Sequence, residues 1–571
     1  VAMTVILAIG VQRMARRRGV VRKLAAAEAL GSTNIILTDK TGTLTTARME
    51  IGALIPEPGV SEEQLLTLAL TNTSVLIENP QDAPAEWRMN GRIVEVSLVR
   101  SAALRGVDTT PASVLESLPF NALNKYSISL IEETNERTLV FVGAPDILLT
   151  HTTLEPEERE ILRARIEQEA YGGGLVLGVA TKKVLRDDAV SLKNFTPTGL
   201  SFVGLITLHD PIRPQVPAAL KLVEDAGVRV VLITGDHRGT AESVARAVGM
   251  KVPEGSVLDA HELRTLSDEE LRERLPLLSI VSRVSPLDKM RIVTAFQAQG
   301  LVVAMTGDGV NDAPSIKQAD VGIAMGSGTA VTREVADLVL LDDNFETIAA
   351  AIDEGRQIRG NVRKVLVYLL SDSTDELFLI GGALLAGLAM PLTALQILWV
   401  NFFSDSFPAV AFAFEKEKDR RLSTSTRLFD PLMTFLILFV GVTTSALLFI
   451  LYWYLLSQGY ALELVQTFIF ASFATYTILS ALALRSLTQS VFSYSFFSNP
   501  AMLGGVGLGL VLTGIAIYVP FFQTLLDTVP LPLSWLVAVA GVALVNILAI
   551  ELAKWLFRTF GLRRVYATSA L

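Results

Sequence analysis

Residues 34–50 read NIILTDKTGTLTTARME, and this stretch guides the interpretation of the rest of the chain. A short apolar run stops at Asp39, and a lysine, a glycine and a cluster of threonines follow it. The run is long enough for a buried β-strand, and ligands of open α/β sheets bind at the carboxyl ends of the strands. The carboxylate at this strand end is therefore a candidate functional group.

The same arrangement recurs downstream. The apolar runs RVVLITGD, LSIVSRV and LVVAMTGD each end at a polar turn, and helical stretches such as RGTAESVARAVGM follow them. Strands that alternate with helices predict a parallel, doubly wound sheet. From Ile51 to about Gly199 the pattern changes, with strands such as YSISLIEE and RTLVFVGA and the acidic helix EPEEREILRARIEQEA. We therefore expect a second domain inserted into the first.

Composition divides the chain into a soluble part and a membrane part. Half of the 571 residues are hydrophobic, and the mean hydropathy of +0.45 is too high for an ordinary soluble protein. Apolar runs dominate residues 361–571, whereas residues 48–360 carry most of the charge. The net charge of −9, without a basic stripe interleaved with aromatic residues, argues against nucleic-acid binding. The absence of cysteine excludes disulfides and thiolate metal sites, and it fits a reducing compartment.

Six segments are candidates for membrane spans, because a spanning helix takes about 20 apolar residues. They are residues 364–388, 392–414, 431–456, 465–484, 501–521 and 532–556. The basic connections QRMARRR, EKEKDRR and KWLFRTFGLRR all fall on the cytoplasmic side if the positive-inside rule is followed. The start, VAMTVILAIG, resembles the end of an earlier span, so we expect upstream helices and a natural N-terminus before Val1.

Four polar clusters follow the predicted strands and should meet at one edge of the sheet. Carboxylates gathered there repel one another unless a cation lies between them, and hard oxygen ligands suit Mg²⁺. A lysine and threonine hydroxyls nearby would hold phosphoryl oxygens. A single TGD is also explained as a turn that caps a helix, but the whole set in this order is not. The clusters are Asp39 to Thr41, Thr234 to Asp236, Lys289, and Thr306 to Asp312.

These motifs together resemble those of the P-type cation-transporting ATPases, within the haloacid dehalogenase superfamily. The motifs are DKTGTLT, DPIR at Asp210–Arg213, TGD, SRVSPLDK ending at Lys289, and TGDGVNDAP at Thr306–Pro314, in the order of the family. The runs MGSGTAVTREVADLVLLDDNF and EGRQIRGNVRK resemble the link to the fifth membrane helix. The similarity covers nearly the whole chain and is greatest to the calcium-pump type.

The resemblance implies that Asp39 is the nucleophile that takes the γ-phosphate of ATP and forms an aspartyl-phosphate. It implies that Mg²⁺ is held by Asp39, the main-chain carbonyl of Thr41 and Asp308. Lys289 would offset charge on the transferring phosphoryl group. The catalytic set implied in this way is Asp39, Lys40, Thr41, Thr234, Gly235, Asp236, Lys289, Asn311 and Asp312.

Thr41 also permits an inference from its chemistry. Phosphatases of this fold carry a second aspartate two positions after the nucleophile, where it acts as acid and base. A threonine cannot activate water in this way, so the acyl phosphate should persist. A persistent phosphoenzyme suits a pump, in which hydrolysis waits for a conformational step, and it argues against a phosphatase fused to membrane anchors.

The insert is expected to bind the nucleotide. LPFNALNKYSISL resembles the stacking motif of the family and places Phe120 against the adenine, although Phe120 also fits a core position. VGAPD resembles a KGAPE motif in which Val142 replaces the lysine, and Leu175 stands where an arginine is expected. Both changes predict weaker or altered ATP binding. The implied nucleotide-binding residues are Glu95, Phe120, Lys125, Gly143, Asp210, Arg213 and Arg283.

Acidic residues within the first complete span are unusual. Asp372 and Glu376 are spaced i, i+4 and share a helix face, and Asp375 lies between them. Charged groups at a helix centre cost at least about 2.5 kcal/mol on insertion scales, although Asp372 and Asp375 also fit a hydrated cytoplasmic end. In the next span, LWVNFFSDSFPAV resembles a calcium-pump stretch, and Pro408 should loosen the helix. The implied cation ligands are Ser373, Asp375, Glu376, Asn401, Ser404 and Asp405.

Two departures leave the transported ion open. Ser373 replaces the asparagine usual in calcium pumps, and the eighth-helix glutamate position is Thr477. Ca²⁺ is the cation that the resemblance favours, and the alternatives are Mn²⁺, Mg²⁺, Na⁺, K⁺ or H⁺. A non-pumping, nucleotide-binding pseudo-transporter is the competing hypothesis, motivated by Val142 and Leu175.

The sequence therefore predicts a multidomain α/β protein with an α-helical membrane part. A doubly wound phosphorylation domain (residues 31–50 and 200–345) holds an α+β nucleotide-binding domain (51–199). Residues 1–30 would end the fourth membrane helix and form a stalk, residues 346–363 a second stalk, and residues 364–571 a six-helix bundle. We expect an integral protein of a prokaryotic plasma membrane with cytoplasmic catalytic domains. Helices one to four and an actuator domain would be supplied from outside this sequence, which contains no TGE.

Overall fold

The computed structural model describes residues 2–109, 113–121, 124–133, 136–171, 174–185, 192, 195–416 and 429–561. The chain forms two compact units, residues Ile35–Ala349 and residues Val1–Asn34 with Ala350–Leu571. Parts of two basic connections used for the topology, residues 417–421 and 562–564, lie outside the described residues.

The first unit contains the predicted parallel sheet, with the strand β2 (Ile35–Thr38) in its interior. Within this unit the strands follow the order β16-β15-β14-β2-β11-β13-β12. All four residues of β2 are buried, and β2 pairs in parallel with β11 on one side and β14 on the other. Strands covered on both faces are continuously apolar, as NIIL is. The remaining strands are β11 (Arg229–Ile233), β12 (Val257–Asp259), β13 (Ile280–Ser282), β14 (Val303–Gly307), β15 (Val321–Met325) and β16 (Leu338–Leu340).

Helices connect these strands and close a core of aliphatic side chains, among them Leu37, Val231, Ile292 and Met305. Each crossover returns the chain so that the next strand ends at the same edge of the sheet. The helices are α7 (Val216–Asp225), α8 (Arg238–Ala247), α9 (Ala260–Thr265), α10 (Asp268–Arg274), α11 (Pro286–Ala298), α12 (Ala313–Gln318) and α13 (Ala330–Val335).

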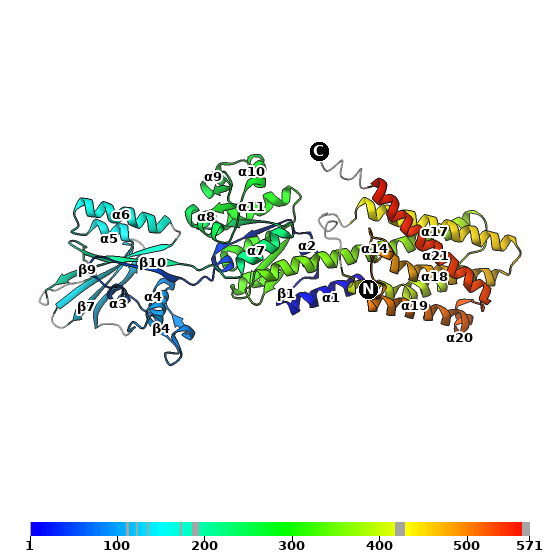
Figure 1. The fold of residues 1–571 in the computed structure, drawn as a ribbon, viewed down its shortest axis with the longest axis horizontal. Helices are drawn as coiled ribbons and strands as arrows, with labels where there is room; N and C mark the ends of the chain where they lie inside the picture. The colour runs from blue at the N-terminus through cyan, green and yellow to red at the C-terminus, as the bar shows by residue number, and fades with distance from the viewer. Residues whose placement is uncertain are drawn as a thin grey trace. The chain divides into compact units, whose positions relative to one another are not determined.

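The insert forms a separate antiparallel sheet of six strands among the described residues, in the order β3-β10-β9-β8-β7-β6. Figure 1 shows α3 and α4 on one face and α5 and α6 on the other, and each pair closes its own core with the sheet. The strands are β3 (Glu50–Pro56), β6 (Val114–Asn121), β7 (Tyr126–Glu133), β8 (Glu136–Gly143), β9 (Leu175–Val184) and β10 (Ser201–His209). The helices are α3 (Glu62–Leu70), α4 (Ile93–Leu104), α5 (Pro145–Thr150) and α6 (Pro156–Tyr171), and a short ribbon joins β4 (Leu76–Ile77) to β5 (Met89–Asn90).

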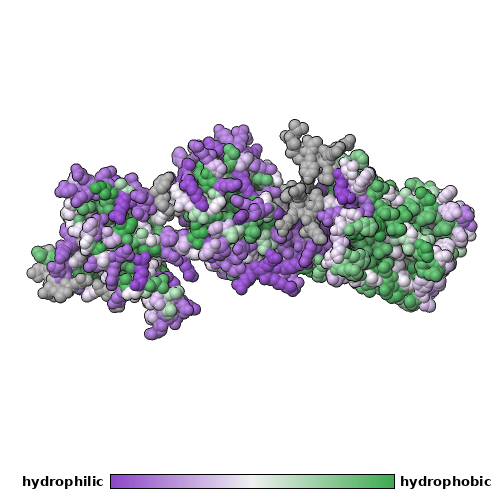
Figure 2. Space-filling view, viewed as in Figure 1, coloured by the Kyte–Doolittle hydropathy of each residue, from purple (hydrophilic) through white to green (hydrophobic). Residues whose placement is uncertain are grey.

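The second unit is a bundle of apolar helices. Figure 2 shows hydrophobic residues covering its visible face, where a soluble domain would present charge. Exposed apolar side chains of this unit include Leu438, Ile450, Val511 and Leu548. Five helical segments among the described residues are long and apolar enough to cross a membrane: Ala394–Phe414, Pro431–Ser457 (α17), Leu462–Ala483 (α18), Pro500–Tyr518 (α19) and Leu533–Phe560, which begins with α21 (Leu533–Leu556). The chain is an integral membrane protein.

The expected bundle of six spans is therefore not confirmed. The first predicted span lies in α14 (Glu346–Leu385), a single 40-residue helix. The apolar end of α14 carries Asp372, Asp375 and Glu376, and α14 is not among these five segments. The next span is not one regular helix either, because α15 (Ala394–Trp399) and α16 (Ser406–Ala411) are joined by a π-helical turn at Val400–Ser404.

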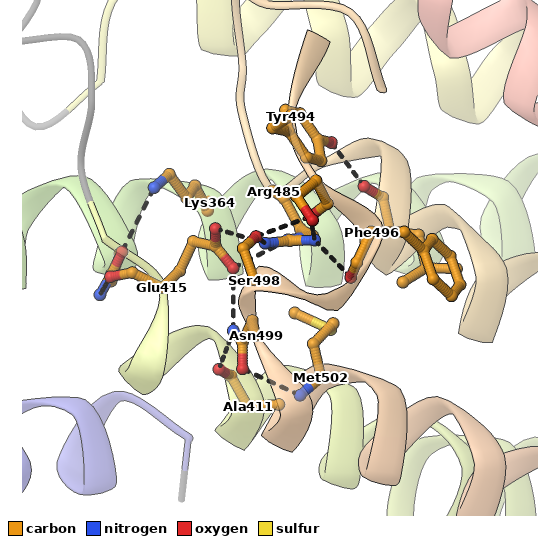
Figure 3. Close-up of polar contacts among 12 residues, drawn as sticks. Lys364, Ala411, Glu415, Arg485, Tyr494, Phe496, Ser498, Asn499 and Met502 are labelled. Atoms are coloured by element: carbon orange, nitrogen blue, oxygen red, sulfur yellow. Dashed lines mark hydrogen bonds and ion pairs between the residues drawn. The ribbon is translucent and has the colours of Figure 1, made fainter. Parts of the chain in front are cut away.

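A buried polar cluster joins one end of several of these helices (Figure 3). Arg485, which follows α18, donates to both carboxylate oxygens of Glu415 at 2.9 and 3.0 Å. Its remaining donors reach the carbonyls of Ser495 and Phe496 and the Ser498 hydroxyl, so all five N–H groups are used. The side chains of Arg485 and Glu415 are only 2% and 11% exposed.

Neighbouring residues extend this hydrogen-bonded cluster to α14 and α19. Asn499 donates to Glu415 and to the carbonyl of Ala411, and its own side-chain oxygen caps the start of α19. On α14, Gln357 and Asn361 both donate to the main-chain carbonyl of Glu415. We call Glu415, Arg485 and Asn499 the polar clamp, since they fix the ends of three helices to one another.

Candidate functional site

The loop after β2 places Asp39 in a buried cluster of charged groups. The Asp39 main-chain N–H donates to the Thr306 carbonyl of the adjacent strand, and the side chain is 11% exposed. Lys289 lies 2.9 Å from Asp39 Oδ1 and 2.6 Å from Asp312 Oδ1. Carboxylate oxygens of Asp39, Asp308 and Asp312 lie within 4.8 Å of one another. The strand ends that the sequence marked thus converge on one point.

Burial gives these groups unusual acidities. Desolvation by burial, with repulsion from Asp312, raises the pKa of Asp39 to about 7 even though Lys289 lowers it. Desolvation and the charge of Asp312 likewise raise the pKa of Asp308 to about 6. Burial by itself lowers the pKa of Lys289, but the two carboxylates outweigh it and the net shift is upward. Three carboxylates facing one lysine leave an excess of negative charge, which a divalent cation would offset.

The loop itself needs a glycine. Gly42 has φ +70°, and a Cβ atom there would lie 1.7 Å from Oδ2 of Asp308. The turn therefore brings the backbone into direct contact with a carboxylate of the cluster, an approach that only glycine permits. Thr41 precedes it with an exposed side chain.

Asp210 and Arg213 support this loop. Thr45 Oγ1 donates to Asp210 Oδ2 at 2.6 Å, and Arg213 donates to the carbonyls of Gly42 and Thr45 at 2.9 and 3.0 Å. The sequence grouped Asp210 and Arg213 with the nucleotide-binding residues. In the structure they contact the loop around Gly42, Arg213 also pairs with Asp343 at 3.7 Å, and neither residue lines the cavity of the insert.

The TGD turn at the end of β11 lies close to the same loop. Asp236 forms an ion pair with Lys40, and the Thr234 hydroxyl accepts from the Asp236 main-chain N–H at 3.1 Å. Arg283 donates its main-chain N–H to the Asp236 carbonyl, and its side chain, 54% exposed, lies 3.9 Å from Asp259. Gly235 is part of this turn, and Asn311 lies exposed on the turn that ends at Asp312.

Lys289 owes its position to a helix cap. Ser285 and Asp288 form a capping box at the start of α11, and Asp288 also accepts from Arg264 at 2.7 Å. The hydrogen bond from Arg264, together with those from Ser285, lowers the pKa of Asp288 to about 2. Nothing in the sequence pattern singles out Asp288, because a Ser-x-x-Asp cap resembles any helix start.

This depressed pKa predicts a pH-dependent contribution to stability. The folded pKa lies below the unfolded value of about 3.9, so the contribution is complete above that value and is lost as the pH falls towards 2. Asp288→Asn is expected to lower the free energy of unfolding by about 1 kcal/mol at pH 7, as losing a charged cap does. Amide hydrogen exchange of α11, measured at pH 7, 4 and 2, determines the difference. A difference of the same size at all three pH values would contradict this assignment.

A second candidate site lies in the insert. A cavity of about 940 Å³ is lined by Glu95, Phe120, Lys125 and Gly143, which were all named from the sequence. Phe120 is 43% exposed, so it is not a core residue. Glu95 Oε2 accepts from the Ser74 main-chain N–H at 3.0 Å. Gly143 lies so close to Lys125 and Tyr126 that a Cβ atom would clash with their backbone.

A third group of polar side chains lies between the apolar helices. Asp405, fully buried, accepts from the Tyr368 hydroxyl at 3.3 Å. Thr477 of α18 donates to Asp372 at 2.9 Å. The Tyr476 hydroxyl, also on α18, contacts Asp375. Two carboxylate oxygens, Asp375 Oδ1 and Asp405 Oδ2, have no hydrogen-bond donor among the described residues.

The structure separates the predicted cation ligands. Asn401 donates to Glu376 at 3.0 Å, which keeps these two together. Ser404 instead faces Thr513 of α19 at 3.5 Å, and Ser373 is exposed on the outer side of α14. Asp372, for which the sequence left both a hydrated helix end and a buried site open, is 5% exposed and lies at the centre of the group. The i, i+4 spacing to Glu376 was the signal that could have included it.

Comparison with known proteins agrees with this geometry. Residues 33–320 match the haloacid dehalogenase-like hydrolase family over half of the chain. The chain belongs to this family. Residues 389–556 match the C-terminal region of cation transporting ATPases. The family match covers β2 and β11 to β14 of the parallel sheet, the insert and the cluster around Asp39.

Relatives of the chain carry matching names. It is 34% identical to "Calcium-transporting ATPase 1" of Yarrowia lipolytica, over 92% of this chain and 62% of the relative. It is 33% identical to "Calcium-transporting ATPase" of Bacillus subtilis, over 94% of this chain and 65% of the relative. A relative from Mycobacterium tuberculosis is named "Probable cation-transporting ATPase F". It is 32% identical to this chain, over 95% of this chain and 65% of the relative. The resemblance to P-type cation-transporting ATPases is confirmed, and the chain spans just under two thirds of the length of these relatives.

Proposed function

We propose that this chain carries the catalytic and ion-binding parts of an ATP-driven cation pump, with Ca²⁺ as the transported cation. The observation that supports it best is the buried cluster at the end of β2, where Asp39 meets Lys289 and two further carboxylates. The names of the relatives support Ca²⁺ as the cation. The relatives come from both a yeast and bacteria. We propose that the protein lies in the plasma membrane of a prokaryote, with its catalytic unit in the cytoplasm.

Mg²⁺ fits the cluster because every nearby donor is a hard oxygen. Asp39, Asp308 and the Thr41 carbonyl would hold it, and it would offset the charge of the phosphoryl oxygens. An oxygen of Asp39 attacks the γ-phosphorus, the bond from phosphorus to the β–γ bridging oxygen breaks, and ADP leaves. Lys289 stabilises the charge that develops on the phosphoryl group. Since Thr41 cannot act as a base, the aspartyl-phosphate persists.

Gly42 offers a direct test of the magnesium site. In Gly42→Ala the new methyl group would push Asp308 out of the cluster. The Mg²⁺ concentration for half-maximal phosphorylation is expected to rise at least about tenfold, which corresponds to roughly 1.4 kcal/mol. Gly227→Ala is the matched control, because Gly227 has φ +75° and no atom within 4 Å of its Cβ position. Equal Mg²⁺ requirements in the two variants would remove Asp308 from the metal site.

The insert, residues 51–199, would bind the nucleotide, with the adenine stacked on Phe120. Its cavity has a size that suits a nucleotide, since ligand pockets measure about 300–1,000 Å³. The exposed aromatic ring at its edge provides a flat face for a base. The surrounding residues 31–50 and 200–345 would form the phosphorylation domain.

The end of α14 would also cross the membrane, which adds one span before the five apolar segments. Its acidic residues point towards α16 and α18, where Asp405, Tyr476 and Thr477 meet them, so the bundle covers these charges from lipid. Carboxylate, amide and hydroxyl oxygens are ligands for Ca²⁺. We propose Asp372, Asp375, Glu376, Asn401 and Asp405 as the cation-binding residues, and this set replaces Ser373 and Ser404 with Asp372.

Acid-stable phosphorylation by ATP in the presence of different cations tests the proposal. With Ca²⁺, Mn²⁺, Mg²⁺, Na⁺, K⁺ and H⁺ supplied in turn, Ca²⁺ is expected to promote phosphorylation at the lowest concentration. Glu376→Gln and Asp405→Asn should each raise that concentration at least about tenfold and leave nucleotide affinity unchanged. Normal Ca²⁺ dependence in both variants would place the cation elsewhere. A protein that binds ATP but forms no phosphoenzyme under any cation would instead be a pseudo-transporter, which Val142 and Leu175 favour.

A further inference from the structure

The cavity of the insert is poor in positive charge for a site that binds a polyphosphate. Among the described residues that line it, Arg92 and Lys125 are the only basic ones. Val142 and Leu175, which replace an expected lysine and arginine, both lie in its wall. Its acidic side chains are Glu95 and Asp146. The phosphate groups of a bound nucleotide therefore need a cationic partner, and within this cavity only Arg92 and Lys125, among the described residues, can provide one.

Arg92 is placed beside the aromatic ring that would hold the base. Its guanidinium lies 5.9 Å from the centroid of the Phe120 ring, and Nη1 donates to the Phe120 main-chain carbonyl at 3.2 Å. The ion pair with Glu95 is long, at 3.9 Å, and half of the Arg92 side chain is exposed. The guanidinium is therefore oriented towards the cavity and is held loosely enough to turn to a ligand.

The backbone around Arg92 also favours an anion. Arg92 is the N-cap residue of α4, a helix of 12 residues, and no side chain caps this end of α4. The next two residues, Ile93 and Val94, line the same cavity. A helix N-terminus carries a partial positive charge and main-chain N–H donors, both of which attract phosphate. Arg92 adds a full charge and a planar fork that matches phosphate oxygens.

We propose that Arg92 binds the phosphate chain of a nucleotide whose base stacks on Phe120, together with the N-terminus of α4. This inference rests on the proposed nucleotide-binding function of the insert. It assigns the cationic contact to the start of α4, whereas the resemblance placed such contacts at positions 142 and 175. The pump would thus retain ATP binding despite the apolar residues at both of those positions.

Binding of ATP and of adenosine, measured by equilibrium dialysis on the purified full chain, separates the phosphate contact from the base contact. Arg92→Ala is expected to weaken ATP binding about tenfold and adenosine binding less than about twofold. Arg92→Lys keeps the positive charge but lacks the planar guanidinium group, so it should recover part of the lost ATP affinity. Arg105→Ala is the matched control, because Arg105 follows the same helix, pairs with Glu62 and lies outside the cavity.

Two results would overturn the inference: unchanged ATP affinity in Arg92→Ala, or an equal loss for ATP and adenosine. Phe120→Ala distinguishes this failure from that of the proposed function. If Phe120→Ala weakens binding of both ligands and Arg92→Ala weakens neither, only the role of Arg92 is wrong. If Phe120→Ala also leaves both affinities unchanged, the cavity is not the nucleotide site and both proposals fail.

Discussion

Asp39→Asn is expected to abolish the acid-stable phosphoenzyme completely. The amide is nearly the same size as the carboxylate, but its oxygen is a poor nucleophile and carries no charge for a metal ion. Lys289 keeps its contact with Asp312 in the variant, so the cluster loses one partner and not its arrangement. The measurement is transfer of labelled γ-phosphate from ATP to the protein, with an acid quench, in membranes that contain the protein.

The variant must remain folded for this result to identify the nucleophile. We expect its nucleotide affinity to equal that of the unmodified protein, since Asp39 does not line the cavity of the insert. Asp225→Asn serves as the matched control, because Asp225 is an exposed carboxylate at the end of α7 in the same sheet domain. Label that persists in Asp39→Asn and is stable to acid would assign the phosphorylated residue to another position.

Arg485→Leu is expected to destabilise the membrane unit by about 3–5 kcal/mol, the range for breaking a buried ion pair. The reason is that Glu415 would remain as a buried charge without its main partner, and the carbonyls of Ser495 and Phe496 would lose a donor. Unfolding of the purified protein by increasing denaturing detergent, followed by tryptophan fluorescence, measures the change.

A second substitution tests whether the uncompensated charge is the cause. Glu415→Leu combined with Arg485→Leu removes both charges, and this double variant is expected to be more stable than Arg485→Leu alone. Arg558→Leu is the control, because Arg558 is exposed near the end of the same unit. A double variant less stable than both single variants would show that the clamp acts through its hydrogen bonds to the backbone, and not through the ion pair.

The sequence predicted well which edge of the sheet gathers the carboxylates, because the signal there is local. Asp39 and Asp308 each follow directly after a short apolar run, as Asp39 follows NIIL. Parallel strands must end at the same edge, so the convergence of Asp39 and Asp308 follows from topology alone. Lys289 reaches them from the first turn of α11, which the helix cap positions. The insert was visible for a similar reason, since its strands interrupt the alternation of strand and helix.

Other features depend on contacts between distant segments, which a single sequence does not display. Asp210 and Arg213 were grouped with the nucleotide, but they support the loop around Gly42 from 165 and 171 residues away. Arg92 and Phe120 belong to different elements, and only the folded sheet brings them together. The polar clamp joins Glu415 to Arg485 across 70 residues, and neither residue stood out in the sequence.

The membrane part shows where periodicity is ambiguous. On α14 the acidic residues fit either a hydrated end or a buried site, and the choice depends on what the neighbouring helices present. Thr477 and Tyr476 of α18 present hydroxyl groups to Asp372 and Asp375. These two carboxyl groups are therefore buried between helices and do not form a hydrated helix end. Ser373, between them in sequence, lies on the opposite face and is exposed.

The carboxyl groups between the apolar helices have an electrical consequence. Asp372, Asp375, Glu376 and Asp405 receive hydrogen bonds from hydroxyl and amide groups, and none of the bonds described for them comes from a cationic side chain. Their charge must therefore be balanced by whatever ions or protons occupy the site. Each elementary charge that crosses the bilayer without a counter-charge is worth about 2.3 kcal/mol per 100 mV. In the proposed pump, the voltage dependence of turnover would therefore measure how many protons replace the cation when the empty site returns across the bilayer.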